Sequence, residues 1–387
     1  MSAQPHRLLD INTNRLLTAV AALGVGAFAL GLTQDPSRTW HALLVNNFYF
    51  LSIALMGAVF IAIHHLVRAG WPTVLRRIPE ALTGYLPIGA ALMVALLFGL
   101  PHVYHWAEPH AADHDAILQA KAAYLNVTAF SIRTILFLTV WLVLTRTLVG
   151  FSRRQDSDTD LRWTERSVRL SAIFIVTFGL TFTLASVDWI MSVDPHWYST
   201  LFPWYVMSST FVASLALITL IAILLNAKGA FPEFNDAHLH DLGKLVFAFS
   251  VFWGYLWFSQ YLLIWYANIP EETTYYRARS TGWLPVFAAN PLINLGIPFL
   301  IISAKSKRNR LLMTGLCVVI LLGHWLDMFL MVMPSVSPEG PKVGWIELAV
   351  GLGFASLFLL SVDRTLRSRP MVPKGDPYLE ESIAHHG

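Results

Sequence analysis

The chain has 387 residues, of which 55% are hydrophobic and only 13% are charged, and its mean hydropathy is +0.54. Soluble globular domains carry charge on about a quarter of their residues, so this composition excludes a soluble protein and indicates a membrane protein. The single cysteine, Cys317, excludes a disulfide framework, a cysteine-held iron–sulfur cluster and a cysteine-ligated zinc site. Any redox centre must therefore belong to partner proteins.

Ten apolar stretches are each long enough to cross a membrane, since roughly 20 helical residues span a hydrocarbon core of about 30 Å. They predict an all-α integral membrane protein with a ten-helix membrane domain at residues 15–364. An N-terminal segment, 1–14, precedes this domain and lacks the pattern of a cleavable signal peptide, and a C-terminal tail, 365–387, follows it. The predicted spans are 15–33, 41–69, 79–102, 124–149, 168–192, 200–226, 242–267, 281–304, 310–334 and 342–364.

The basic residues are divided unequally between the two sides of the membrane. Of the 27 Lys and Arg residues, 21 lie at the span ends and loops on the side that carries both termini, and Arg133 lies inside the fourth span. Because Lys and Arg accumulate in cytoplasmic loops, we expect both termini to be cytoplasmic. The five basic residues on the opposite side are Arg38, Lys121, Arg277, Arg279 and Lys342.

The fifth and ninth predicted spans share a sequence pattern. Each carries an acidic residue seven positions before a proline, Asp188 before Pro195 and Asp327 before Pro334. The two spans are four apart and therefore run in the same direction. We accordingly predict two related four-helix bundles, spans 2–5 and spans 6–9, flanked by spans 1 and 10.

Ionisable side chains inside the spans cost several kcal/mol unless they are paired or hydrated, so each is a candidate for a polar path. In the half of the membrane opposite the termini they are Arg133, Asp188, His324, Asp327 and Glu347. We expect Arg133 to reach Asp188 across adjacent helices, as a static ion pair or as part of a path. We expect Glu347 to lie near the headgroups and to reach water.

His324 and Asp327 are three residues apart and share one face of span 9, where a carboxylate can orient an imidazole. Such a pair can pass protons. It can equally bind the hydroxyl of a quinol, which releases two protons when it is oxidised. In a structural role, it would only attach span 9 to its neighbours.

In the half near the termini, His64 and His65 close span 2, while Asp241 and Lys244 open span 7. These residues can draw water and protons towards the bundle, or Asp241 and Lys244 can simply cap a helix start. Polar side chains between the two halves are candidates for a hydrogen-bonded chain, with carbonyls freed by prolines in span 8. They are Tyr255, Ser259, Gln260, Tyr261, Asn290 and Asn294, with Ser208, Ser209 and Thr210.

We expect neither haem nor a bound metal in this chain. A bis-histidine haem needs facing intramembrane histidines, and those inside the spans lie near opposite surfaces. The loop after span 3 is rich in possible ligands, but their spacing matches no compact site. These residues are His102, His105, His110 and His114, with Glu108, Asp113 and Asp115.

Several sequence motifs carry a resemblance to a known family. They are DWIMS and DPHWYST within 188–200, HDLGK at 240–244, WFSQY at 257–261, WYANIPEE at 265–272, and HWLD at 324–327. Together they resemble the membrane subunit called ActF of bacterial alternative complex III, a quinol:cytochrome c oxidoreductase of respiratory or photosynthetic chains. That subunit belongs to the NrfD/polysulfide-reductase-like superfamily. The resemblance covers most of the chain from span 2 to span 10.

The resemblance implies a location in the bacterial cytoplasmic (inner) membrane, among lipids and other membrane subunits and with no nucleic-acid partner. The implied partners are a sister NrfD-like subunit (ActC), an iron–sulfur subunit (ActB) and c-type haem subunits (ActA and ActE). Haem c and iron–sulfur clusters would belong to those partners, and menaquinol or ubiquinol would be oxidised mainly in the sister subunit. The positions of this chain that match the family motifs are Asp188, Asp241, Lys244, His324 and Asp327.

The sequence thus leaves three hypotheses open. The first is a redox-inactive subunit, not catalytic alone, that conducts protons through two polar half-paths joined near the midplane and coupled to quinol oxidation next door. The second is a quinol-binding subunit with its site at His324 and Asp327. The third is a structural scaffold in which the buried charges pair statically.

Overall fold

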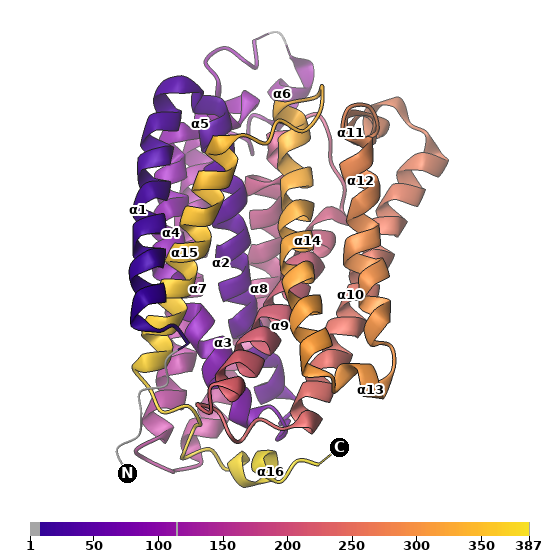
Figure 1. Ribbon diagram of the computed structural model, residues 1–387. Helices are drawn as coiled ribbons and strands as arrows, with labels where there is room; N and C mark the ends of the chain where they lie inside the picture. The colour runs from indigo at the N-terminus through magenta and orange to yellow at the C-terminus, as the bar shows by residue number, and fades with distance from the viewer. Residues whose placement is uncertain (1–7, 114, 387) are drawn as a thin grey trace.

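The computed structural model describes residues 8–113 and 115–386, and in these residues the chain forms helices and turns without a strand. Ten helical segments in this described part are long and apolar enough to cross a membrane, as predicted, and they stand side by side in Figure 1. They are α1 (Ile11–Gln34), α2 (Pro36–Leu66), a broken third span (Thr73–Val103), α7 (Val127–Gln155), α8 (Arg162–Trp189, extended to Val193 by η5), α9 (Phe202–Ala227), α10 (Asp236–Ala267), a broken eighth span (Leu284–Ile301), α14 (Arg310–Val336) and α15 (Trp345–Arg367).

Prolines interrupt the third and eighth spans, because proline has no N–H for the helical ladder and its ring clashes with the preceding turn. The eighth span changes after Pro291 from an α-helix to a π-helical and then a tighter helix. The third span consists of η1 (Thr73–Leu75), α3 (Arg77–Leu82), η2 (Thr83–Tyr85), α4 (Leu86–Ala95), η3 (Leu96–Gly99) and α5 (Leu100–Val103). The eighth consists of α12 (Leu284–Pro291), η6 (Leu292–Gly296) and η7 (Ile297–Ile301).

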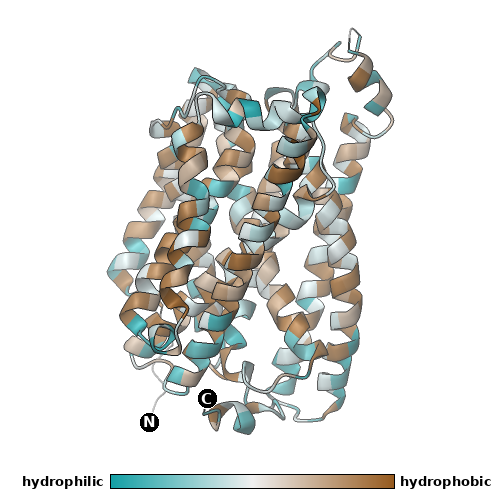
Figure 2. Cartoon of the chain, turned by 90° about the vertical axis from the view of Figure 1, so that its right-hand side faces the viewer, coloured by the Kyte–Doolittle hydropathy of each residue, from teal (hydrophilic) through white to brown (hydrophobic). Residues whose placement is uncertain are grey.

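Short helices lie between the spans and after the last one. They are η4 (His105–Ala107), α6 (Ala116–Lys121), α11 (Pro270–Ser280), α13 (Ala304–Lys307) and α16 (Leu379–Ile383), whereas η5 (Met191–Val193) belongs to the fifth span. The start of α1 and α16 lie at one end of the molecule, which we call the terminal end, whereas α6 and α11 lie at the other, which we call the loop end (Figure 1). Hydrophilic residues are most frequent at these two ends, and hydrophobic residues dominate between them (Figure 2).

The spans pack as the two predicted four-helix bundles. In the first, α2 packs on α8 and α4, and α7 packs on α8; in the second, α9 packs on α10 and α14, which both contact η6. The bundles meet where α2 packs on α9, and these two helices are almost entirely buried. The flanking spans α1 and α15 pair with each other, so closely that a Cβ added to Gly24 would lie 2.6 Å from the Cα of Gly353. Small residues permit this approach of two backbones in a membrane.

Candidate functional site

Asp327 of α14 is fully buried and accepts hydrogen bonds from four uncharged side chains. The Ser209 hydroxyl donates to Oδ2 over 2.8 Å and Trp253 Nε1 donates to Oδ2 over 3.0 Å. Asn290 Nδ2 donates to Oδ1 over 2.7 Å, and the Tyr205 hydroxyl donates to the same oxygen. The donors come from α9, α10 and α12, so all four spans of the second bundle meet at this carboxylate. These five residues and His324 are called the Asp327 cluster below.

No Lys, Arg or His of the described chain forms an ion pair with Asp327, although the carboxyl group lies among buried side chains. Burial penalises the ionised form of a carboxyl group, whereas hydrogen-bond donors stabilise it. Two opposing influences therefore act on this group. A change in its protonation would not require a salt bridge to break.

His324 is joined to Asp327 through Ser209 rather than directly, which refines the predicted pair. Its Nδ1 lies 3.0 Å from the Ser209 hydroxyl oxygen. A hydroxyl has one proton, and Ser209 donates it to Asp327, so His324 Nδ1–H is the donor to Ser209. The Nε2 atom of His324 is then an acceptor that is buried without a hydrogen-bond partner among the described residues.

Other buried polar atoms around the Asp327 cluster also lack partners within the described chain. Asn294 donates from Nδ2 to Asn290 Oδ1 over 2.7 Å, but its own Oδ1 accepts nothing, and the same is true of Gln260 Oε1 and Ser250 Oγ. Buried polar atoms are normally hydrogen-bonded, so each such atom needs an explanation. The positions of these residues and of His324 along α10, η6 and α14 place the unpartnered atoms on both sides of Asp327.

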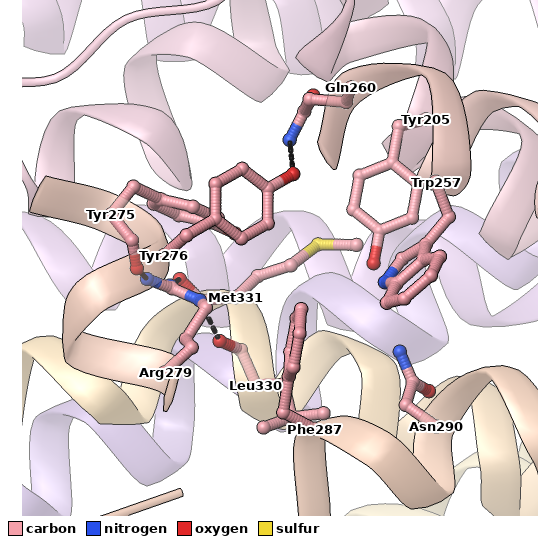
Figure 3. A pocket seen from close by; sticks show the side chains of 10 residues that line it. All are labelled: Tyr205, Trp257, Gln260, Tyr275, Tyr276, Arg279, Phe287, Asn290, Leu330 and Met331. Atoms are coloured by element: carbon pink, nitrogen blue, oxygen red, sulfur yellow. Dashed lines mark hydrogen bonds between the residues drawn. The ribbon is translucent and has the colours of Figure 1, made fainter. Parts of the chain in front are cut away.

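A small cavity lies between the Asp327 cluster and α11 at the loop end (Figure 3). Its volume of about 10 Å³ is room for about one water molecule. Gln260 Nε2 donates to the Tyr276 hydroxyl over 3.1 Å at its wall. Burial raises the pKa of Tyr275 to about 12 and also raises that of Tyr276, so both phenols keep their protons at neutral pH. The lining residues are Tyr205, Trp257, Gln260, Tyr275, Tyr276, Arg279, Phe287, Asn290, Leu330 and Met331.

Arg279, one of the five basic residues predicted on the side opposite the termini, also lines this cavity. It is 2% exposed, and its guanidinium donates to the carbonyl oxygens of Leu330 over 3.0 Å and Met331 over 2.9 Å. Pro334 has no N–H, so the Leu330 carbonyl four residues earlier has no helical partner, and Arg279 replaces it. A proline within a predicted span was the signal that such a donor is needed.

The predicted pair of Arg133 and Asp188 is present, and two hydrogen bonds join the two side chains. Arg133 Nε lies 2.7 Å from Asp188 Oδ2 and Nη2 lies 3.1 Å from Oδ1, and the Tyr124 ring covers the guanidinium at 4.0 Å. Asp188 and Asp327 occupy corresponding spans, and each accepts a hydrogen bond from the span before it. That donor is the cation Arg133 for Asp188 and the neutral amide Asn290 for Asp327.

Two expectations about individual residues are wrong. Glu347 does not reach water, because it is 1% exposed, is held by Arg38 Nε and Nη2 over 2.8 to 2.9 Å, and caps α15 at the Gly344 N–H. Tyr255 does not join an internal hydrogen-bonded chain, because it is 63% exposed and points out of the bundle. Tyr261 lies near the cavity, but the structure gives its ring stacking partners, Trp257 among them, rather than a place in a hydrogen-bonded chain.

At the terminal end, the C-terminal tail gathers the predicted residues. Lys244 and His385 both pair with Asp241, the latter over 2.7 Å. The His385 ring lies near the Trp71 ring, which packs against His64. His65 is buried, and its Nε2 has no partner among the described residues. This end therefore connects His64 with Asp241 through the tail, but it lies apart from the Asp327 cluster.

An apolar stretch separates the two regions. On α10, Lys244 and Ser250 are six residues apart, which is about 9 Å along the helix, and the five residues between them are apolar. Helix α10 thus supplies no polar side chain between the predicted half-path at the terminal end and the cluster.

No group of three or more His, Cys, Asp or Glu in residues 8–113 and 115–386 is arranged to hold a metal ion, and the predicted loop residue His114 lies outside these ranges. Comparison with models of protein families finds no match, and no curated protein matches the chain. The fold and the site define a multi-pass membrane protein with a buried carboxylate held only by neutral donors.

Proposed function

We propose that this chain is a redox-inactive membrane subunit that binds and releases a proton at Asp327, coupled to quinol oxidation in a neighbouring subunit. The complex is a quinol oxidoreductase of the alternative complex III type in the bacterial inner membrane. The terminal end faces the cytoplasm, in keeping with its basic residues. Iron–sulfur clusters and c-type haems belong to the partner subunits.

The single observation that carries this proposal is the absence of a cationic partner for Asp327 in the described chain. Asp188, its counterpart in the first bundle, is paired with the cation Arg133. Asp327 is free to change its protonation, because its four donors are neutral. Intramembrane carboxyl groups of this kind are typical of proton relays.

The surroundings of Asp327 supply a route on the loop side and a barrier on the terminal side. The water-sized cavity leads from Tyr205 and Asn290 towards α11 at the loop end, whereas Ser209 links the carboxylate to His324, about one helical turn nearer the terminal end. The apolar stretch before Ser250 opposes passive leakage of protons from the terminal end. A subunit that couples proton movement to quinol oxidation needs such a barrier at rest. During turnover, water entering this apolar stretch would bridge it.

The cavity size favours proton transfer over quinol binding at this site. Pockets for small organic ligands usually have volumes of about 300 Å³ or more. The cavity beside Asp327 has a volume of about 10 Å³ and would have to open widely to admit a quinol ring.

The test replaces Asp327 with Asn in the complex purified with its native partners. The haem and iron–sulfur spectra of the purified complex also test whether this chain belongs to such a complex. Asn keeps the size and polarity of the side chain but cannot release a proton. We expect quinol oxidation to continue while the number of protons released per electron in proteoliposomes falls. Glu165→Gln, the same chemical change at an exposed position of α8, should leave the proton yield unchanged.

Two results would contradict the proposal. An unchanged proton yield in an assembled Asp327→Asn complex would support a structural scaffold. Loss of quinol-analogue binding in the same variant would place a quinol at His324 and Asp327 instead.

A further inference from the structure

Two adjoining grooves at the terminal end are lined by the third span, α7 and α15, away from the Asp327 cluster. Their volumes are about 400 and 340 Å³. They share Gly84, Arg153 and Thr365. Helix η2 approaches α15 closely here, since a Cβ added to Gly84 would lie 2.2 Å from the Thr365 hydroxyl oxygen. We call this pair of grooves the arginine groove.

Three arginines without acidic partners line the arginine groove, beside Arg369, which is paired with Glu80. Arg364 faces the first groove, Arg146 the second and Arg153 both, and none of the three forms an ion pair within the described residues. The nearby carboxylates are already engaged by other arginines. Glu80 is held by Arg77 and Arg369, Asp363 by Arg367, and Asp156 by Arg77. The groove therefore presents uncompensated positive charge.

The groove also extends from the headgroup level into the hydrocarbon region. Arg153 lies in the last turn of α7 and Arg364 in the last turn of α15. Apolar side chains continue the walls towards the membrane interior, namely Ile88, Leu142, Leu357 and Leu360. Arg146 is seven residues before Arg153, about 10 Å deeper along α7, from where a long side chain can extend towards the headgroups.

We propose that the arginine groove binds one anionic phospholipid, with the phosphate at Arg153 and Arg364 and an acyl chain along the apolar walls. Guanidinium groups bind phosphate oxygens through paired hydrogen bonds, and basic pockets between membrane helices on this side suit acidic headgroups. A free anion would use the arginines but not the apolar walls. A zwitterionic lipid would use the walls but leave the positive charge uncompensated. The lipid joins α7 of the first bundle to the flanking helix α15.

The test is native mass spectrometry of the full-length protein with added phosphatidylglycerol or phosphatidylethanolamine of identical acyl chains. We expect one phosphatidylglycerol to bind at least about tenfold more tightly than phosphatidylethanolamine, and Arg153→Gln to remove about tenfold of that affinity. Arg154→Gln is the matched control, because Arg154 is the next residue, lies over the Trp163 ring and does not line the groove. The affinity of the Arg154→Gln variant for phosphatidylglycerol should equal that of the native protein.

Three results would overturn the proposal. They are equal binding of the two lipids, equal effects of Arg153→Gln and Arg154→Gln, and displacement of phosphatidylglycerol by millimolar inorganic phosphate. If Arg153→Gln does not fold, Arg364→Gln on the other wall of the first groove replaces it with the same expected loss.

Discussion

Asp188 and Asp327 illustrate how one change of neighbour alters the chemistry of a buried acid. Both are fully buried, and both accept a hydrogen bond from the preceding span. Arg133 makes Asp188 part of a closed pair, in which each charge compensates the other. Asn290 gives Asp327 a hydrogen bond without a charge. Asp188 is therefore suited to a structural link, whereas Asp327 is suited to binding and releasing a proton.

Replacing Asp188 with Asn should destabilise the protein by about 3 kcal/mol, because it leaves the Arg133 guanidinium inside the bundle without its carboxylate. The double variant Arg133→Gln with Asp188→Asn should recover most of this loss, since neither charge then remains buried. Thermal unfolding in detergent, with both variants measured against the native protein, checks this expectation. Equal stability of the single variant and the native protein would show that the pair is dispensable.

The sequence predicts the acids at the site better than it predicts their partners. Arg133 with Asp188, and His324 near Asp327, follow from depth and helical spacing. Tyr205 and Trp253 were missed, because an aromatic residue in an apolar span has no distinctive pattern. Tyr255 was assigned to the interior wrongly for a related reason. Spans are apolar towards both lipid and protein, so periodicity does not identify the inward face as it does in a soluble helix.

At the scale of helices, prolines determine where side chains must supply donors. Pro334 lies inside α14 and leaves the Leu330 carbonyl without a helical partner. Arg279, from the short helix α11, donates to that carbonyl and to Met331. A loop-end helix is thereby attached to a membrane span beside the cavity. The sequence indicated the break in the ladder, but the distance along the chain between the two residues concealed the donor.

Arg279→Ala should destabilise the protein by about 2–3 kcal/mol, because the buried Leu330 carbonyl loses its donor and the Met331 carbonyl loses one of its hydrogen bonds. Adding Pro334→Ala should restore part of this loss, since residue 334 then provides an N–H for the Leu330 carbonyl. Arg277→Ala, an exposed change on the same helix, is the control and should have little effect. The free energies of unfolding of the native protein, the two single variants Arg279→Ala and Pro334→Ala, and the double variant form a double-mutant cycle. Strictly additive effects of Arg279→Ala and Pro334→Ala would contradict the compensation.

At the scale of the whole molecule, the C-terminal tail holds the two bundles together at the terminal end. The Ser382 hydroxyl donates to the Trp71 carbonyl over 2.6 Å and accepts from the Val74 N–H over 3.1 Å, beside the first bundle. The Ser382 carbonyl lies 3.0 Å from His238 Nε2 of the second bundle. The predicted ten-span architecture and its two bundles are confirmed, whereas this connection was not foreseen, because short polar tails have no strong structural signal.

Removal of residues 378–387 should increase amide hydrogen exchange at 71–75 and 235–241, since these segments lose contacts with the tail. The middle of α2 and α9 should keep its protection, because those helices are buried by other spans. Hydrogen exchange measured by mass spectrometry distinguishes the two regions. A uniform increase throughout the bundles would mean that the tail supports the entire fold, and no increase would mean that it is only passively attached.

The central position of α2 has a consequence for how the protein is made. Asn46 in α2 accepts a hydrogen bond from Trp325 over 2.8 Å, and Arg38 at its start pairs with Glu347. About 280 residues are synthesised between α2 and its last partner, which takes roughly 15–60 s at ordinary rates of translation. During that interval we expect the insertion machinery to shield the polar groups of α2. If assembly is slow, these groups become exposed, and membrane quality-control proteases can degrade the nascent chain.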